Sequence, residues 1–325
     1  MQISNRPRRN RKNQAMRNLV RENAISNNDL IAPLFFIEGN NQRVAIDSMP
    51  GQYRLSVDNL VKKVKDLQSL GISCVSLFPA VDEALKTKDA KEAYNPDALN
   101  QRAVKEVKNA CPDILVMTDI ALDPYSSDGH DGLVNDKGEI LNDETLEVLG
   151  KMALAQAKAG SDIVGPSDMM DSRIGFIRMV LEEEGFKNTS IMAYTAKYAS
   201  SFYGPFRDAL DSAPKAGDKK TYQMDYANSE EALRELYLDE AEGADIVMVK
   251  PGLAYLDIIQ KLKMNSTLPV AAYNVSGEYA MVKAAAANGW LDEEATMVEM
   301  LTSFKRAGAD MILTYFAEDM ARLNS

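Results

Sequence analysis

Two lysines each end an apolar, strand-like run of this sequence. Lys197 closes the run 191–197, and Lys250 closes the run 245–250, just before Pro251 and Gly252. If the preceding residues are core, each amine lies beside apolar walls, and lost solvation disfavours its ammonium form and lowers its pKa. Two such amines in one pocket would lower each other's pKa further. A neutral amine is a nucleophile, typically for imine formation with a ketone or aldehyde. The alternative is that each stem packs on the core while its charged end reaches water.

Eight short apolar runs predict the strands that would position these lysines. They are almost continuously apolar, as expected of parallel strands buried on both faces. Helical periodicity fills the intervening segments, around residues 57–67, 146–153, 174–181, 255–262, 278–287 and 293–306. The predicted strands are 30–37, 74–78, 114–119, 162–165, 190–195, 245–249, 270–274 and 311–316.

A glycine junction recurs between a predicted helix and the strand that follows it, at Gly71, Gly160, Gly243 and Gly308. Glycine supplies the left-handed conformation that ends many helices. The repeated unit predicts the α/β class and a (β/α)8 TIM barrel. A doubly wound open sheet is the alternative, which is disfavoured because no Gly-x-Gly-x-x-Gly follows the first strand.

A barrel gathers its functional groups at the C-terminal ends of the strands. The residues at these predicted ends are polar and chemically useful, which favours chemistry for the two lysines. They are Asp119, Ser167, Asp168, Lys197, Lys250, Ser276 and Tyr315.

Composition and charge narrow the class of protein. The 325 residues are 46% hydrophobic and 26% charged, enough for one large domain or two smaller ones. No run approaches eighteen apolar residues, so no membrane span is expected. A net charge of −11 argues against nucleic acid as a main partner. With no apolar segment after Met1, no secretory signal is expected. Cys74 and Cys111 form no metal pattern, which suits buried, reduced thiols in a cytoplasmic protein, with a disulfide as the alternative.

A long segment follows Lys197 and predicts a lid over residues 198–225. It is longer than the usual loop between a strand and a helix, and it is rich in glycine, serine, aromatic and cationic residues. Within it, Arg207 and Lys219 could clamp a carboxylate or a phosphate. The alternative is a solvated excursion without a ligand.

The segment 121–132 after the third strand holds Asp123, Asp128, Asp131 and the only histidine, His130. Such hard oxygen ligands suit Mg²⁺ better than Zn²⁺, although an Asp- and Gly-rich loop is often only a turn. His130 is either a catalytic base or a loop histidine making ordinary hydrogen bonds.

Two hydroxyls follow the last two predicted strands. Ser276 precedes a helix, which is a natural anion position, and Tyr315 adds a phenolic donor. Each hydroxyl could instead satisfy backbone groups.

Taken with these residues, longer motifs make the sequence resemble the porphobilinogen synthase (5-aminolevulinate dehydratase) family over nearly its whole length. The two lysine motifs together are highly specific. The matching stretches are 48–51, 54–56, 194–208 with the Phe-Tyr-Gly-Pro-Phe-Arg sequence at 202–207, 248–252, 275–279, 288–290 and 304–310.

This resemblance implies a reaction, in which two 5-aminolevulinate molecules condense to porphobilinogen with loss of two waters, in tetrapyrrole biosynthesis leading to haem and chlorophyll. It implies that Lys250 forms the imine at one substrate site, the P site, and Lys197 the imine at the other, the A site. Arg207 and Lys219 would hold the A-site carboxylate. The P-site carboxylate would be held by Ser276 and Tyr315.

The resemblance also implies the assembly and domain layout. Residues 1–28 would form an N-terminal arm that embraces a neighbour in a homo-octamer, and residues 29–325 the catalytic barrel. The arm contains the basic cluster at 6–12. Taken alone, that cluster is either a solvated tail or a segment that docks on an acidic neighbouring subunit.

The metal loop departs from the zinc-dependent branch of the family, which carries three cysteines where this chain has Ala121, Asp123 and Asp131. Without thiolates a catalytic Zn²⁺ is not expected. Asp123 and Asp131 remain candidates for proton transfer, for binding the substrate amine or as weak ligands. The aspartate-bearing branch implies an allosteric Mg²⁺ with Glu235 as its carboxylate, completed by retained waters. Taken alone, Glu235 is an ordinary helix glutamate.

Two other functions stay open on the residues alone. A class I aldolase-like barrel needs one imine lysine and usually a phosphate site, so the second lysine and the paired anion clamps disfavour it. A non-catalytic binding or scaffold barrel would not need intact lysines, clamps and a lid. Retro-aldol cleavage without pyrrole formation would favour the first, and ligand binding without turnover the second.

Overall fold

The computed structural model describes residues 4–210 and 212–325. Eight parallel strands follow one another around a closed sheet, and β12 pairs with β1 to complete the ring. The barrel prediction is therefore correct, and all eight predicted strands are present. They are β1 (Leu30–Ile37), β4 (Cys74–Pro79), β5 (Leu115–Ile120), β8 (Ile163–Pro166), β9 (Ser190–Lys197), β10 (Ile246–Lys250), β11 (Val270–Asn274) and β12 (Met311–Thr314).

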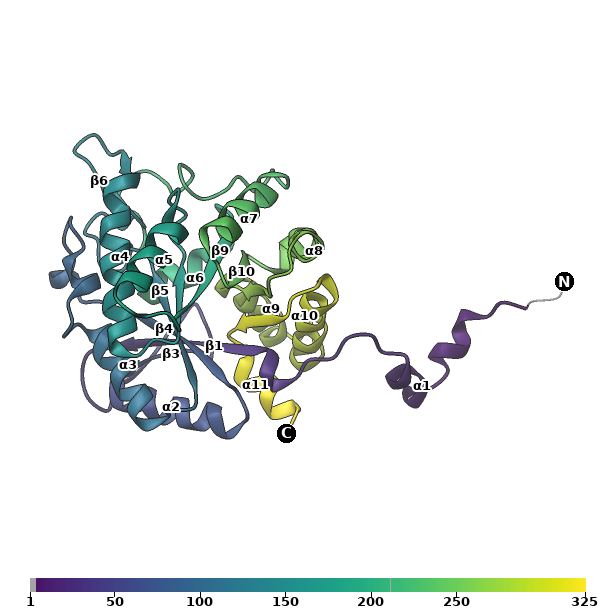
Figure 1. The fold of residues 1–325 in the computed structure, drawn as a ribbon. Coiled ribbons are helices and arrows are strands. Elements are labelled where there is room, and N and C mark those ends of the chain that lie inside the picture. Colours follow the sequence, from purple (N-terminus) through teal and green to yellow (C-terminus); the bar gives the residue numbers. More distant parts are fainter. Residues whose placement is uncertain (1–3, 211) are drawn as a thin grey trace.

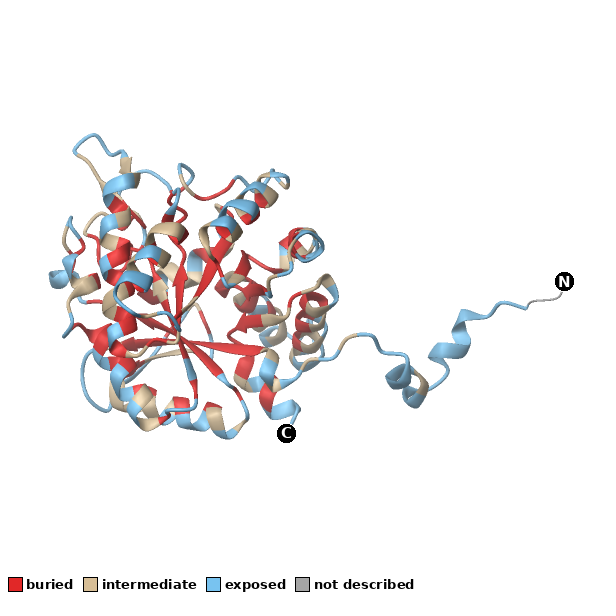
Figure 2. Ribbon diagram, in the orientation of Figure 1, coloured by how far each residue is buried: buried red, intermediate tan, exposed pale blue. Residues whose placement is uncertain are grey.

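Helices surround the barrel and bury their apolar faces against it (Figure 1, Figure 2). The six predicted helical segments correspond to α2, α4, α5, α8, α9 and α10. The helices are α1 (Gln14–Leu19), α2 (Val57–Ser69), α3 (Leu99–Ala110), α4 (Asn142–Ala159), α5 (Arg173–Glu183), α6 (Gly204–Leu210), α7 (Glu231–Glu242), α8 (Leu256–Asn265), α9 (Ser276–Ala287), α10 (Glu293–Ala307) and α11 (Ala317–Leu323). None of these helices, within the described residues, is long and apolar enough to cross a bilayer.

The recurring junction before a strand has two structural tasks. Its glycines are left-handed, as predicted, with φ of +109° at Gly160 and +114° at Gly308, which ends α4 and α10. The aspartate that follows caps a neighbouring strand. The Asp162 carboxylate accepts from the Val116 N–H at 2.8 Å, and the Asp310 carboxylate accepts from the Val270 N–H at 2.7 Å. The motif therefore satisfies a backbone donor at the start of the ladder, which stabilises the end of the barrel opposite the two lysines.

Short elements outside the repeat extend one edge of the barrel mouth. The hairpin of β2 (Arg43–Ala45) and β3 (Tyr53–Ser56) lies beside the end of β1, where Phe35 pairs with Arg54. A second hairpin, of β6 (Leu133–Val134) and β7 (Ile140–Leu141), precedes α4. The 3-10 helices are η1 (Pro7–Arg11), η2 (Asn27–Asp29), η3 (Glu83–Leu85), η4 (Lys91–Tyr94), η5 (Ser201–Tyr203) and η6 (Leu253–Tyr255).

The part of the chain around η1 and α1 extends away from the barrel, whereas η2, just before β1, packs against it (Figure 1). Neither η1 nor α1 has a buried residue. The Asn13 side chain accepts from the Met16 N–H at 2.9 Å and caps α1. Within the described residues, η1 and α1 are thus left exposed, and the subunit-binding arm over residues 1–28 stays a prediction.

Both cysteines are buried free thiols. Burial raises the pKa of Cys74 to about 12 and also raises the pKa of Cys111 above its ordinary value. The alternative of a disulfide is therefore wrong for these two residues, and both thiols act as small core groups.

Candidate active site

The two lysines lie side by side at the C-terminal mouth of the barrel. Lys250 on β10 and Lys197 on β9 are partners in the strand register. Their exposed fractions are 6% and 5%. Since partners on adjacent parallel strands point to the same side, both amines enter one chamber, as the sequence predicts.

Lys250 is enclosed by aromatic rings. Its Nζ lies 4.7 Å from the ring centre of Tyr273, 5.1 Å from that of Tyr194 and 5.2 Å from that of Tyr203. The ring of Phe206, from the lid segment, is 5.0 Å away. Within residues 4–210 and 212–325, no acidic or amide side chain forms an ion pair or hydrogen bond with this amine. A ring face stabilises a cation less than water does, so the enclosure favours a neutral amine.

Burial lowers the pKa of Lys250 from 10.5 to about 7. The neighbouring ammonium of Lys197 lowers it further, while Asp119 is the first of the carboxylates that oppose the shift. At neutral pH a substantial fraction of Lys250 is therefore the neutral, nucleophilic form.

Lys197 has a different environment, made of acceptors. Its Nζ donates to Asp131 Oδ2 at 3.0 Å and to the carbonyl oxygen of Ser167. The second oxygen of Asp131 accepts from Lys219 Nζ at 2.5 Å, and Asp123 Oδ2 accepts from the same ammonium at 3.2 Å. The buried carboxylate of Asp131 thus joins the cations of Lys197 and Lys219. Lys197 therefore has a carboxylate partner, whereas Lys250 has aromatic rings around it.

The carboxylate that joins them stays ionised. Burial alone would raise the pKa of Asp131, but the ammonium groups of Lys197 and Lys219 hold it below its ordinary value. Burial likewise opposes the charge of Lys219, yet Asp123 and Asp131 keep its pKa raised. The structure therefore brings together Asp123, Asp131, Lys197 and Lys219, all predicted from the sequence as site residues.

Asp119, at the end of β5, is a further titratable group in this chamber. Burial raises its pKa to about 6, against the attraction of Lys250 and then Lys197. A carboxyl that titrates near neutral pH beside two amines is suited to moving protons. The sequence identifies Asp119 as a strand-end residue but gives it no role, because its signal depends on the distance to lysines far along the chain.

The predicted P-site hydroxyls lie on the other side of Lys250. Tyr315, which follows β12, has its hydroxyl 2.9 Å from that of Tyr273, and its ring stacks on Phe35 with centres 5.8 Å apart. Ser276 is 1% exposed, and its hydroxyl accepts from the Phe206 N–H at 3.0 Å. Ser276 thus fastens the lid segment to α9.

The predicted lid is partly helical rather than an open loop. It contains η5 and α6, which carries Arg207. Arg207 and Lys219 line a shared cavity of about 700 Å³ to which neither Lys197 nor Lys250 contributes, so their pairing as a clamp stays a prediction. Arg54 on β3 donates to the carbonyl oxygens of Ala209 at 2.6 Å and Asp208 at 2.5 Å, so the β2–β3 hairpin holds the end of α6.

His130 makes two ordinary hydrogen bonds. Its Nδ1 lies 3.1 Å from the Tyr222 hydroxyl, and its Nε2 lies 2.9 Å from the carbonyl oxygen of Ala216. Both ring nitrogens are therefore engaged with the lid segment. Of the two interpretations, the structure favours the hydrogen-bonding histidine over the catalytic base.

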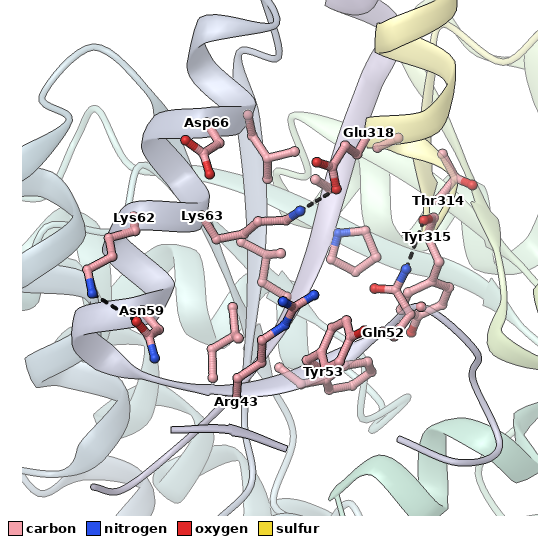
Figure 3. Close-up of a pocket in the computed structure, with 18 of the residues that line it drawn as sticks. Arg43, Gln52, Tyr53, Asn59, Lys62, Lys63, Asp66, Thr314, Tyr315 and Glu318 are labelled. Atoms are coloured by element: carbon pink, nitrogen blue, oxygen red, sulfur yellow. Dashed lines mark hydrogen bonds and ion pairs between the residues drawn. The ribbon is translucent and has the colours of Figure 1, made fainter. Parts of the chain in front are cut away.

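A separate cavity of about 520 Å³ lies between β1, β3, α2 and α11 and reaches Tyr315 from outside the lysine chamber (Figure 3). Arg43 stacks 3.8 Å over the Tyr53 ring, and Gln52 donates to the carbonyl oxygen of Tyr315 at 3.2 Å. Neither catalytic lysine lines this cavity, so it is not the place of the imine chemistry. Residues of the β2–β3 hairpin, which supports the mouth of the barrel, line part of this cavity.

Glu235, the predicted Mg²⁺ ligand, lies on α7 at a third cavity, of about 680 Å³. Burial raises its pKa to about 6, Arg173 opposes the shift, and Asp239 and Asp171 add to it. Lid residues Tyr222–Asp225 line the same cavity. Within the described residues no three Asp, Glu, His or Cys side chains converge as a complete metal shell. A cation at Glu235 would therefore need retained waters to complete its shell, and the Mg²⁺ site stays a prediction.

Comparisons with known proteins agree over almost the whole chain. The sequence profile of the family described as Delta-aminolevulinic acid dehydratase matches residues 4–323. A chloroplastic Delta-aminolevulinic acid dehydratase of Chlamydomonas reinhardtii is 54% identical over 98% of this chain and 84% of that protein. The Delta-aminolevulinic acid dehydratase of Bradyrhizobium diazoefficiens is 55% identical over 99% of this chain and 91% of that protein.

A solved structure is equally similar. The crystal structure of delta-aminolevulinic acid dehydratase (porphobilinogen synthase) from Toxoplasma gondii, in complex with the reaction product porphobilinogen, superposes with a TM-score of 0.97 at 55% identity. The match covers 99% of this chain and 92% of that one.

Proposed function

This chain belongs to the delta-aminolevulinic acid dehydratase family, and from that premise we propose how its own residues perform the reaction. The enzyme is a lyase that condenses two molecules of 5-aminolevulinate to porphobilinogen, with loss of two waters, in tetrapyrrole biosynthesis. The observation that carries the residue assignment is the register of Lys250 with Lys197, one amine enclosed by rings and the other held by a carboxylate.

Lys250 forms the P-site imine. Its pKa of about 7 supplies a neutral amine without a separate base to deprotonate it. Lys197 forms the A-site imine. Asp131 contacts its amine, and both lysines act electrostatically on Asp119, whose pKa is about 6. Two imines activate two ketones, and holding them on adjacent strands replaces a bimolecular encounter.

The carboxylates of the two substrates require separate anchors. Arg207 and Lys219 share one cavity and take the A-site carboxylate, while the hydroxyls of Ser276 and Tyr315 take the P-site carboxylate. For this task the Ser276 hydroxyl turns its hydrogen from the carbonyl oxygen of Phe202, 3.5 Å away, to the substrate, which couples substrate binding to the lid. Asp123 and Asp131 are acceptors suited to a substrate ammonium.

Mg²⁺ is proposed as a regulatory ion at Glu235, where it would supply positive charge and ordered waters between α7 and the lid end at Tyr222–Asp225. A catalytic Zn²⁺ is not proposed, because the metal loop carries Ala121, Asp123 and Asp131 and offers no thiolate. We also propose a homo-octamer in which the exposed arm of one subunit contacts another, and a cytoplasmic location suited to the two free thiols.

Incubation of the purified protein with 5-aminolevulinate tests the function. The wild type should form the pyrrole porphobilinogen. Lys250→Ala should form none above background while keeping the wild-type circular dichroism spectrum. A wild type that binds 5-aminolevulinate without forming a pyrrole, or that only cleaves aldols, would refute the assignment. Pyrrole formation by Lys250→Ala would refute the role of Lys250.

A further inference from the structure

A buried glutamate links the three strand ends that build the P site. Glu278, the third residue of α9, is 1% exposed. Its Oε1 accepts from the Leu253 N–H at 2.8 Å, and its Oε2 accepts from the Val275 N–H at 3.1 Å and from Asn274 Nδ2 at 2.8 Å. Every bond made by this carboxylate is therefore an accepted one.

The first of these bonds fixes the chain after Lys250. Leu253 comes three residues after that lysine, at the start of η6. Gly252 in this turn approaches β11 so closely that a side-chain carbon there would lie 3.0 Å from the carbonyl oxygen of Tyr273 and 2.5 Å from the ring of Phe304. The Glu278 carboxylate thus holds a turn that has almost no room to shift. This turn directly follows Lys250 in the chain.

The second oxygen of the carboxylate fixes the chain before Ser276. Val275 is the residue between β11 and α9, so its N–H positions the first residue of the helix, Ser276. A glutamate at the third helical position commonly accepts from the backbone N–H that precedes the helix. Here the same carboxylate also accepts from the Leu253 N–H, beyond the end of β10.

Asn274 extends the connection to β12. Its Oδ1 accepts from the Thr314 hydroxyl at 2.8 Å, and the Thr314 hydroxyl accepts from the Phe316 N–H at 3.1 Å. Asn274 and Thr314 are register partners, and both are fully buried. Tyr315 lies between the two anchored positions 314 and 316. The Glu278 carboxylate is therefore connected, through the Asn274 amide, to the residues on both sides of Tyr315.

We propose that Glu278, acting through Asn274 and Thr314, is a positioning residue that sets the spacing between the Lys250 amine and the Ser276 and Tyr315 hydroxyls. The proposal rests on the P-site assignment above. 5-Aminolevulinate has two methylene carbons between its ketone and its carboxylate, so imine and anchor must lie at one fixed separation. Misplacement by about 1 Å can cost roughly 100-fold in rate. Glu278 itself touches no substrate, since backbone and amide donors cover both of its oxygens.

The test compares variants that leave every substrate-contacting side chain in place. Glu278→Gln keeps the size but replaces one acceptor oxygen with a donor group facing N–H donors. Thr314→Val removes only the hydroxyl, and Thr314→Ser retains it. Asp310→Asn is a control on the same strand pair, because Asp310 caps Val270 at the opposite end of β11 and β12.

The readout is the amount of each lysine adduct trapped by borohydride at a subsaturating 5-aminolevulinate concentration, with kcat and KM measured in parallel. We expect Glu278→Gln and Thr314→Val to lower the Lys250 adduct about tenfold and to raise KM, with the Lys197 adduct within about twofold of wild type. Thr314→Ser and Asp310→Asn should keep wild-type labelling and KM, even where the melting temperature falls.

Other results would overturn the proposal. Wild-type labelling and KM in a folded Glu278→Gln or Thr314→Val protein would mean that the network is only structural, as would equal loss of both adducts. If Glu278→Gln does not fold, the comparison of Thr314→Val with Thr314→Ser decides whether the network positions the P site. A wild type in which Lys250 is never labelled would refute the proposed function itself, and the positioning role with it.

Discussion

Replacing Lys250 by methionine should stabilise the folded chain while removing its nucleophile. Burial, and then the neighbouring charge of Lys197, lowers the pKa of Lys250 from 10.5 to about 7. One pKa unit corresponds to about 1.4 kcal/mol. The lowered pKa therefore means that the folded chain loses roughly 5 kcal/mol of stability when the buried Lys250 amine is protonated. Methionine has a similar length and carries no charge. Allowing for altered packing, we expect the free energy of unfolding to rise by about 2–4 kcal/mol.

The pH dependence gives this prediction its sign. Between about pH 7 and 10.5 the unfolded chain binds the Lys250 proton and the folded chain does not, so in the wild type this contribution to stability rises with pH. Below pH 7 the folded state carries the full cost of a buried ammonium. The stability advantage of Lys250→Met should therefore be complete below about pH 7 and shrink as the pH approaches 10.5.

Chemical denaturation at about pH 6 and about pH 9.5 measures this difference for wild type and variant. Lys88→Met is the matched control, because the Lys88 side chain is 69% exposed and its replacement should change stability by no more than about 0.5 kcal/mol. The reasoning is refuted if Lys250→Met is no more stable than wild type at the lower pH, or if its advantage is independent of pH.

Three further predictions concern Asp131, Glu235 and Arg54. Asp131→Asn removes the carboxylate between Lys197 and Lys219, so unfolding should become easier by about 3–5 kcal/mol, and denaturant midpoints equal to wild type would contradict this buried pairing. Glu235→Ala should abolish stimulation by Mg²⁺ and keep the activity measured in chelator, whereas an intact Mg²⁺ response would remove Glu235 from the ion's shell. Arg54→Met should raise KM several-fold by releasing the end of α6, with kcat/KM as the assay and an unchanged KM as the contrary result.

The fold was predictable because its strands are short, apolar and separated by a repeated helix–glycine–strand junction. What escaped prediction has no such local signal. The strand β2 has three exposed residues and is held by pairing with β3. Helix α6 begins with Gly204 and Pro205, which suggest a turn, although proline is also favoured in the first turn of a helix. That proline was the available signal for a helix inside the lid.

The candidate site was predictable as a set of residues, but its asymmetry was not. Lys197 and Lys250 end similar apolar runs, and nothing local distinguishes them. Their difference depends on Asp131, which is 66 residues before Lys197 in the chain, and on rings brought from several elements around Lys250. Glu278 was missed for the same reason, because its role depends on the Leu253 N–H from a separate strand end.

The central claim is that two adjacent lysines of unlike environment hold the two substrates as imines. Borohydride reduction of the wild type during turnover of 5-aminolevulinate, followed by peptide mass mapping, tests it most directly. We expect adducts at both Lys250 and Lys197, with the Lys250 adduct formed first at low substrate because its pKa is about 7. Adducts confined to other lysines, or no adduct while pyrrole accumulates, would contradict the account.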